Sequence, residues 1–176
     1  MVSCIELQSE RLRLRTTKEG DRSSVIAIRK TDAVRLWWRG DDLSAEFAED
    51  LGDEDSHQLT IEEKDNQIVG LIQFSEEEDP DYRHATLDIY VDPSAHRKGY
   101  ATEAIKTVIE YLFAERDHHR LTIDPAADNT AAVACYRKIG FQPVGRLREY
   151  ERRADGVWID GLLMELLRSD RQSTTG

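Results

Sequence analysis

The chain of 176 residues has little cysteine and no long apolar run. Cys4 and Cys135 are its two cysteines, and they lack metal-ligand spacing, so we expect neither a disulfide framework nor a structural metal. No stretch approaches the ~18 apolar residues of a membrane span. Residues 1–6 lack the basic and apolar regions of a signal peptide. We therefore expect a cytoplasmic protein that does not bind membranes.

Positive charge is also scarce, since 24 lysines and arginines face 35 acidic residues, which leaves a net charge of −11. Binding of nucleic acid requires basic patches that contact phosphates, so the composition argues against such a partner. A negative field instead concentrates cations near the protein. The charge favours a small cationic ligand, although a well-solvated acidic surface would give the same composition.

No linker composition and no internal repeat divides the chain. Its length suits one domain that buries enough surface to fold without covalent cross-links. Hydrophobic residues make up 39% and charged residues 34%, as in a globular protein. We expect a single domain over residues 1–168 and a frayed polar tail over residues 169–176.

Hydrophobic periodicity predicts a mixed α/β sheet. Residues 7–15 alternate, with Leu12 and Leu14 on one face and three arginines on the other, as in a half-buried strand. The turn pairs at residues 65–66 and 155–156 predict hairpins. The other predicted strands are 59–63, 68–74, 85–91, 121–123, 144–152 and 157–167, and the predicted helices are 16–32, 101–113 and 130–139. Residues 41–55 are expected to form a short helix and a loop.

The segment at residues 87–101 carries the clearest binding signal. A strand ends at Asp92 and Pro93, and a long helix opens at Gly99. Free backbone N–H groups at a helix N-terminus form an anion site, and a glycine lets a phosphate approach the main chain. Arg97 and Lys98 add positive charge to an otherwise acidic protein. An ordinary loop that enters a helix would share these features.

Two motifs resemble those of the GNAT superfamily of N-acetyltransferases. Residues 96–101, HRKGYA, resemble the cofactor motif of Arg or Gln, two residues, Gly, one residue, then Gly or Ala. His96 replaces the Arg or Gln, which puts the first side-chain contact in doubt but not the backbone cradle. Residues 129–141 resemble the signature N-x-x-A-x-x-x-Y-x-x-x-G-F. The resemblance covers roughly residues 12–167.

The resemblance implies a GNAT fold, an α/β architecture whose mostly antiparallel sheet is splayed between strands 4 and 5 and flanked by helices. It implies acetyl-CoA as co-substrate and no metal. The pantetheine arm would bond to main chain in the gap like an extra strand. Asn129 would reach the pantetheine, or would simply cap a helix. The cofactor-binding residues expected from the resemblance are Ile89, Val91, His96, Arg97, Lys98, Gly99, Tyr100, Ala101, Thr102 and Asn129.

The implied reaction is direct attack of a neutral amine on the acetyl thioester. Tyr136 occupies the position of the tyrosine that many relatives hold beside the sulfur, which makes it the expected general acid; a core tyrosine is the alternative. Asp88 is the expected base, with substrate anchoring as its alternative role. The main-chain N–H of Tyr90 or Val91 is the expected oxyanion donor. Cys135 has no histidine nearby in sequence and is expected to be inert.

The acceptor is expected to be a small polycation. Trp37, Trp38, Asp124 and Asp88 resemble the drug site of aminoglycoside 6′-N-acetyltransferases, which makes a 6′-amino aminoglycoside our expected substrate and antibiotic resistance the implied role. Carboxylates and aromatic faces both bind cations. Alternatively, the tryptophans belong to the core and Asp124 starts a turn.

Residues 11–15 and 99–104 resemble instead the spermidine and ribosomal-protein N-terminal acetyltransferases, which gives a second candidate substrate class. A non-catalytic acetyl-CoA-binding module is a third reading, against which the presence of both Tyr136 and Asp88 argues. The sequence does not establish the oligomeric state, and a homodimer is one option.

Overall fold

The structure is a computed structural model that describes residues 4–153 and 155–172. Hydrogen bonds order its eight described strands as β1-β2-β3-β4-β5-β6-β8-β7. The pairs β1–β2, β2–β3, β3–β4, β6–β8 and β7–β8 are antiparallel, whereas β5–β6 is parallel. The β5–β6 ladder consists of only two pairs, Ala85↔Leu121 and Thr86↔Thr122, as expected where a sheet splays. The predicted mixed α/β fold is confirmed.

The described chain divides into two compact units. The first unit contains the residues before position 76 together with 89–108, and the second contains residues 76–88 together with those from 109 onward. The elements β4, β5 and α4 run through both. The single domain expected over residues 1–168 stays a prediction.

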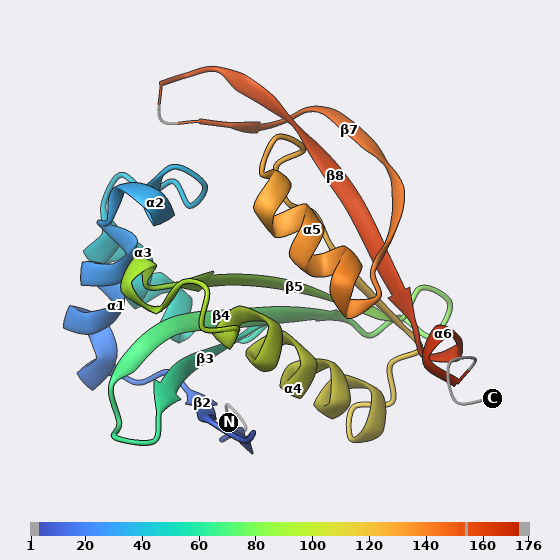
Figure 1. Cartoon of the computed structure of the whole chain (residues 1–176), viewed down its shortest axis with the longest axis horizontal. Helices are drawn as coiled ribbons and strands as arrows, with labels where there is room; N and C mark the ends of the chain where they lie inside the picture. Colours follow the sequence, from blue (N-terminus) through green and yellow to red (C-terminus); the bar gives the residue numbers. More distant parts are fainter. Residues whose placement is uncertain (1–3, 154, 173–176) are drawn as a thin grey trace. The chain divides into compact units, whose positions relative to one another are not determined.

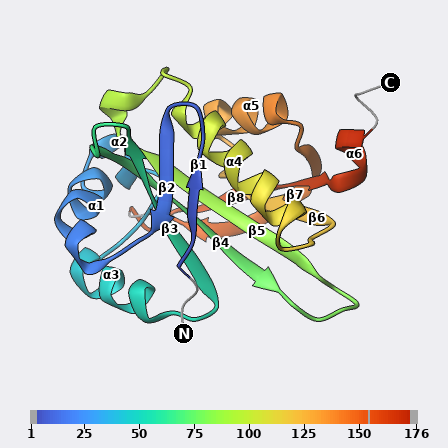
Figure 2. The ribbon, with the colours of Figure 1, turned by 90° about the horizontal axis from the view of Figure 1, so that it is seen from below.

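The first unit packs helices against a sheet. Its elements are β1 (Glu6–Gln8), β2 (Leu12–Thr16), η1 (Glu19–Asp21), α1 (Arg22–Arg29), α2 (Asp32–Arg35), α3 (Leu43–Gly52), β3 (Ser56–Glu63), β4 (Ile68–Glu77), the end of β5 (His84–Val91), η2 (Pro93–Ala95) and the start of α4 (Tyr100–Ala114). Val25, Phe47 and Leu71 bring α1, α3 and β4 into one buried cluster. Figure 2 shows α1 and α3 on one side of β2 and β3.

Gly70 of β4 lies so close to β5 that no side chain fits. A Cβ there would come 2.4 Å from the carbonyl oxygen of Tyr90. The N–H of Asp92 then donates to the carbonyl of Val69 at 2.7 Å. The glycine therefore allows the end of β5, where the predicted cofactor loop begins, to lie against β4.

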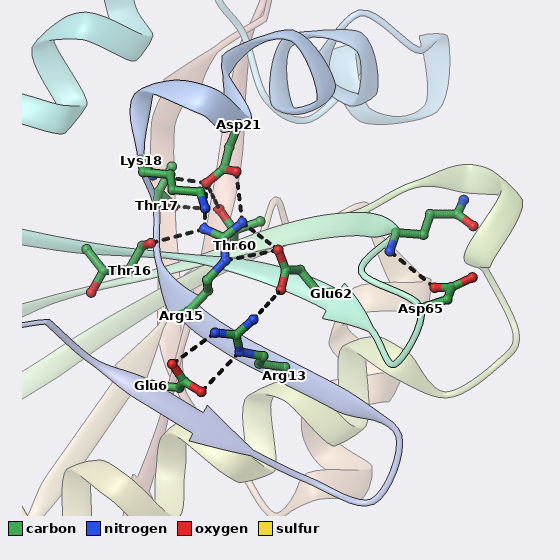
Figure 3. Close-up of polar contacts among 11 residues, drawn as sticks. Glu6, Arg13, Arg15, Thr16, Thr17, Lys18, Asp21, Thr60, Glu62 and Asp65 are labelled. Atoms are coloured by element: carbon green, nitrogen blue, oxygen red, sulfur yellow. Dashed lines mark hydrogen bonds and ion pairs between the residues drawn. The ribbon is translucent and has the colours of Figure 1, made fainter.

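The arginine face of β2 is not solvent-facing throughout. Arg15 is mostly buried, and its Nη1 and Nη2 atoms donate to the two carboxylate oxygens of Asp21 at 2.7 and 2.8 Å (Figure 3). Its Nε donates to Glu62 of β3 at 2.9 Å. Asp21 also accepts from the hydroxyl of Thr60 at 3.1 Å. Leu12 and Leu14 are buried as predicted.

Burial disfavours the ionised form of Asp21, but the hydrogen bonds to its carboxylate favour that form more strongly. Desolvation by burial acts to raise its pKa, whereas the Arg15 guanidinium and the backbone N–H of Lys18 lower it, so the pKa lies below its usual value. The same contacts raise the pKa of Arg15. The network therefore stays charged at neutral pH and ties β2, β3 and η1 together.

The second unit carries a long hairpin beside a helix. Its elements are the start of β5, the end of α4, β6 (Arg120–Ile123), α5 (Thr130–Ile139), β7 (Gln142–Arg152), β8 (Trp158–Leu167) and α6 (Arg168–Gln172), and Figure 1 shows β7 and β8 as the hairpin. Asn129 caps α5 by accepting from the N–H of Ala132 at 3.2 Å. Gly140, with φ +126°, ends the helix, so both predicted helix ends are confirmed.

Three sequence predictions differ from the structure. Residues 7–15 were expected as one strand, but a turn in which the N–H of Ser9 donates to the Leu12 carbonyl separates β1 from β2. The helix expected over residues 16–32 is confined to α1, preceded by η1. The tail expected to fray begins with α6, and its residues 173–176 lie outside the described residues.

Within the described residues, no helix combines the length and apolar character needed to cross a membrane. The cytoplasmic location and the homodimer stay predictions.

The ion network predicts how stability depends on pH. Asp21→Asn leaves a buried arginine with one fewer carboxylate, so we expect the free energy of unfolding to fall by on the order of 3 kcal/mol at pH 7. Because the folded pKa of Asp21 is lowered, this stabilisation is complete above the ordinary carboxyl pKa of about 4 and is lost as the pH falls through the folded value. Urea titrations of both proteins measure the difference.

Glu19→Gln is the matched control, because Glu19 pairs with Arg22 at an exposed site of the same segment. Its unfolding free energy should stay close to that of the wild type. Equal losses in the two variants, or a loss from Asp21→Asn that does not shrink as the pH falls below about 4, would contradict the role of the network.

Candidate functional site

A backbone cradle precedes α4 in the first unit. Arg97 and Gly99 both have positive φ, +63° and +82°, and α4 begins at the next residue, Tyr100. The N–H of Glu103 donates to the Gly99 carbonyl at 3.0 Å, so the N–H groups of the first turn point out of the helix end. Left-handed residues beside a helix N-terminus form a concavity of N–H groups that binds anions. A phosphate group fits this geometry.

Side chains around the cradle brace the loop. Arg11 of the β1–β2 turn pairs with Glu103 at 2.6 Å, and its Nη1 donates to the Lys98 carbonyl at 2.7 Å. Lys98 lies 3.5 Å from Glu63, which also accepts from the hydroxyl of Tyr100. The sequence did not single out Arg11, because nothing local links residue 11 to a loop almost 90 residues away.

His96 contacts protein rather than projecting freely from the loop. Its Nε2 lies 3.1 Å from the carbonyl oxygen of Val91, at the end of β5. The side chain therefore ties the loop to the strand. A direct contact between this side chain and the cofactor stays a prediction.

Tyr136 is buried on α5 in the second unit. Its side chain is 6% exposed, and its ring meets that of Phe141 edge-on at 6.2 Å. Burial raises its pKa well above the usual value, and the carboxylates of Asp88 and Asp124 raise it further. The phenol therefore keeps its proton at every physiological pH and can serve as a hydrogen-bond donor.

Three carboxylates of the second unit act electrostatically on one tyrosine, Tyr150. Asp88 on β5, Asp124 after β6 and Glu151 on β7 are each partly buried. Burial and then Asp124 raise the pKa of Glu151, against an opposing effect of Arg153. We call Asp88, Asp124 and Glu151 the acidic cluster. Such a cluster favours a cation, because each positive charge relieves repulsion between carboxylates.

A second tyrosine belongs to this region. The hydroxyl of Tyr150 donates to Oδ2 of Asp124, and this hydrogen bond raises the pKa of Tyr150 to about 12. Tyr150 and Glu151 were not among the predicted site residues. Both lie in a stretch of β7 where the register shifts, so strand alternation could not place them.

Trp37 and Trp38 both belong to the first unit. Trp38 packs against the core of the first unit, with its ring 4.7 Å from that of Tyr90 and 5.8 Å from the Arg29 guanidinium. The cavity that it lines there has a volume of about 10 Å³, enough for one water molecule. Trp38 is only partly buried, so its substrate contact stays a prediction beside the core alternative. A substrate contact by Trp37 stays a prediction.

Comparison with known proteins shows the family. Residues 11–142 match the model of the acetyltransferase (GNAT) domain. The chain belongs to the GNAT family. It is therefore an acetyl-CoA-dependent N-acetyltransferase, with acetyl-CoA as co-substrate. Acetyl-CoA supplies an activated acetyl thioester, and the cradle at residues 97–102 is suited to its phosphates.

Similar proteins include spermidine N(1)-acetyltransferases. That of Vibrio cholerae serotype O1 is 24% identical over 167 residues, which cover 92% of this chain and 95% of the relative. That of Escherichia coli K12 is 28% identical over 142 residues, which cover 77% and 75%. The crystal structure of spermidine N-acetyltransferase from Vibrio cholerae in complex with CoA and spermine superposes with a TM-score of 0.80 at 22% identity, over 93% of this chain and 99% of that one.

We propose that Tyr136 donates a hydrogen bond to the leaving sulfur, and its conservative variant tests this. Tyr136→Phe keeps the packing against Phe141 but removes the donor. We expect turnover to fall about 100-fold or more with the melting temperature almost unchanged. Steady-state thiol release and thermal unfolding provide the two measurements.

Tyr111→Phe removes a phenol from α4 and should keep wild-type turnover. Wild-type turnover in Tyr136→Phe would show that Tyr136 has only a structural role.

Proposed function

We propose that this enzyme transfers acetyl from acetyl-CoA to a primary amine of spermidine or a related small polyamine. The acidic cluster is the observation that carries the proposal. The similarity to spermidine N(1)-acetyltransferases of two bacteria supports it. Among the alternatives weighed from the sequence, this one has more support than the aminoglycoside.

The charge of the cluster suits a flexible polycation. Spermidine carries several ammonium groups separated by methylene chains, so different groups can approach different carboxylates. Asp124 and Glu151 sit on separate elements of the second unit, after β6 and on β7. Because burial and like charges hold the pKa of Glu151 above its usual value, a bound ammonium group offsets an existing repulsion.

The aminoglycoside hypothesis gains no separate support from Trp38. It expects Trp38 to present a face to a sugar ring or a cation, and the Trp38 indole already contacts Tyr90 and the Arg29 guanidinium in the first unit. The carboxylates that this hypothesis uses, Asp88 and Asp124, would bind the ammonium groups of a polyamine equally well. The remaining features therefore do not distinguish the drug, and the spermidine relatives favour the polyamine.

Asp88 and Tyr136, both in the second unit, take different roles in the proton chemistry of the reaction. An acceptor nitrogen must lose a proton before or as it attacks a carbonyl carbon, and Asp88 accepts that proton directly or through water. Asp124 and Glu151 hold the remaining ammonium groups. Tyr136 donates to the leaving sulfur as negative charge develops there. A thiol has a pKa near 8.5, below that of this buried phenol, so Tyr136 stabilises the thiolate mainly by hydrogen bonding.

A panel of amines tests the proposed acceptor. Spermidine, spermine, a 6′-amino aminoglycoside and an N-terminal ribosomal peptide are assayed for thiol release with acetyl-CoA under identical conditions. We expect spermidine or spermine to give the highest kcat/KM. The amine KM should rise with salt, because ions screen exposed charges over about 8 Å at physiological ionic strength.

Asp124→Asn should raise the spermidine KM more than it lowers kcat, as expected for an anchor. Asp117→Asn is the matched control, because its exposed carboxylate pairs with Arg168 away from the cluster. Turnover of the aminoglycoside with none of either polyamine would overturn the proposed substrate and leave the family assignment intact.

A further inference from the structure

The strand β7 contains a wide bulge opposite β8. Leu147 pairs with Gly161 and Glu151 pairs with Ile159, so four steps along β7 face two steps along β8. Glu149, within the bulge, has a φ of +49°, which is uncommon for a residue with a side chain. Bulges of this kind redirect side chains and are frequent beside functional sites.

Asp160 of β8 holds the bulge in place. Its Oδ1 accepts from the backbone N–H of Glu149 at 2.9 Å, and its Oδ2 accepts from Nε of Arg146 at 2.7 Å. Asp160 therefore holds Arg146, just before the bulge, and Glu149, the left-handed residue within it. This fixes the position of the next residue, Tyr150.

The ring of Tyr150 lies directly on Gly161. A Cβ at position 161 would come 2.8 Å from Cδ1 of the ring and 3.3 Å from Cγ, so only glycine leaves room for it. From there the hydroxyl reaches Asp124 and donates to Oδ2. Half of the Tyr150 side chain remains exposed, so a ligand can approach it.

The main chain after Asp124 is also tied to β8. The N–H of Leu162 donates to the Pro125 carbonyl at 2.9 Å, and the N–H of Ala127 donates to the Asp160 carbonyl at 2.8 Å. Asp124 is thus held twice, through its backbone by β8 and through its carboxylate by Tyr150. A carboxylate has about four acceptor sites, so the bond to Tyr150 leaves capacity for an ammonium group.

We propose that Tyr150 is a positioning residue that orients the Asp124 carboxylate to receive an ammonium group of the acceptor, and this rests on the proposed function. The bulge of β7, the clamp of Asp160 and the glycine at position 161 together place its hydroxyl. A carboxylate held in its binding orientation loses less side-chain freedom when the acceptor binds. Tyr150 therefore contributes to acceptor affinity without contacting the reacting atoms.

Tyr150→Phe tests this by removing the hydroxyl while keeping the ring on Gly161. Immobilising one side chain on binding corresponds to about a 3- to 10-fold loss in affinity, so we expect the spermidine KM to rise by that factor with kcat nearly unchanged. The KM for acetyl-CoA should not move. Tyr82→Phe, at an exposed tyrosine of the same unit, is the control and should keep all three constants.

A double-mutant cycle separates positioning from a general effect on folding. In an Asp124→Asn background, Tyr150→Phe should raise the spermidine KM by less than 2-fold, since a positioning residue acts through its partner. Gly161→Ala should mimic Tyr150→Phe by displacing the ring. These comparisons apply to variants whose melting temperatures match that of the wild type or of the single variants.

An unchanged or lowered spermidine KM in Tyr150→Phe would overturn the positioning role and leave the proposed function standing. A full effect of Tyr150→Phe in the Asp124→Asn background would also overturn it. A wild-type enzyme that acetylates no polyamine would overturn the proposed function and this inference together, so the two failures are distinguishable.

Discussion

The crowding of partly buried carboxylates in the second unit is the constraint on which the proposed chemistry of this enzyme depends. Asp88, Asp124 and Glu151 lie on different elements of that unit; burial and Asp124 raise the pKa of Glu151, and all three carboxylates act to raise the pKa of Tyr150. A fold gains nothing from such crowding by itself, because ionised groups lose hydration and repel. In the proposed function, a polycation relieves both costs. Burial, and then Asp88 and Asp124, raise the pKa of Tyr136, so its phenol keeps its proton.

Other buried carboxylates of this chain have a lowered pKa, in contrast to Glu151. In the first unit, Asp21 and Glu62 share the guanidinium of Arg15, and the pKa of Asp21 is lowered rather than raised. In the second unit, Glu76 accepts from Arg116 at 2.8 Å and its pKa is also lowered, with burial opposing the change. These carboxylates are neutralised within the protein. The pKa of Glu151 is raised instead, which is a physical reason to place a cation beside it in the proposed function.

Much of the fold followed from local sequence signals. Asn129 and Gly140 stand at the ends of a periodic apolar segment, so the limits of α5 could be read directly. Gly99 lies between a strand and a helix, where the sequence predicted that a phosphate approaches the main chain, and its φ is +82°. The GNAT resemblance rested on these same two segments, and the family match includes both.

The parts that sequence reasoning did not find depend on contacts between distant residues. Arg15 reaches Glu62, 47 positions away, so an alternating strand could not reveal that its polar face is partly buried. The bulge of β7 breaks the alternation that would have assigned Tyr150 and Glu151 to a face. The contact between Trp38 and Tyr90 joins residues 52 positions apart, so the sequence did not show it.

Proton release on binding of spermidine is the most direct test of the acidic cluster. Titration calorimetry without acetyl-CoA, in buffers of different ionisation enthalpy, measures it between about pH 4.5 and 7, where the amines stay protonated. Because a bound ammonium group favours ionised carboxylates, we predict net release of protons at the acidic end that fades as the pH rises. Glu151→Gln should diminish the release, and Glu115→Gln, at an exposed residue, should not. Binding with no proton release, or with proton uptake, would contradict the account.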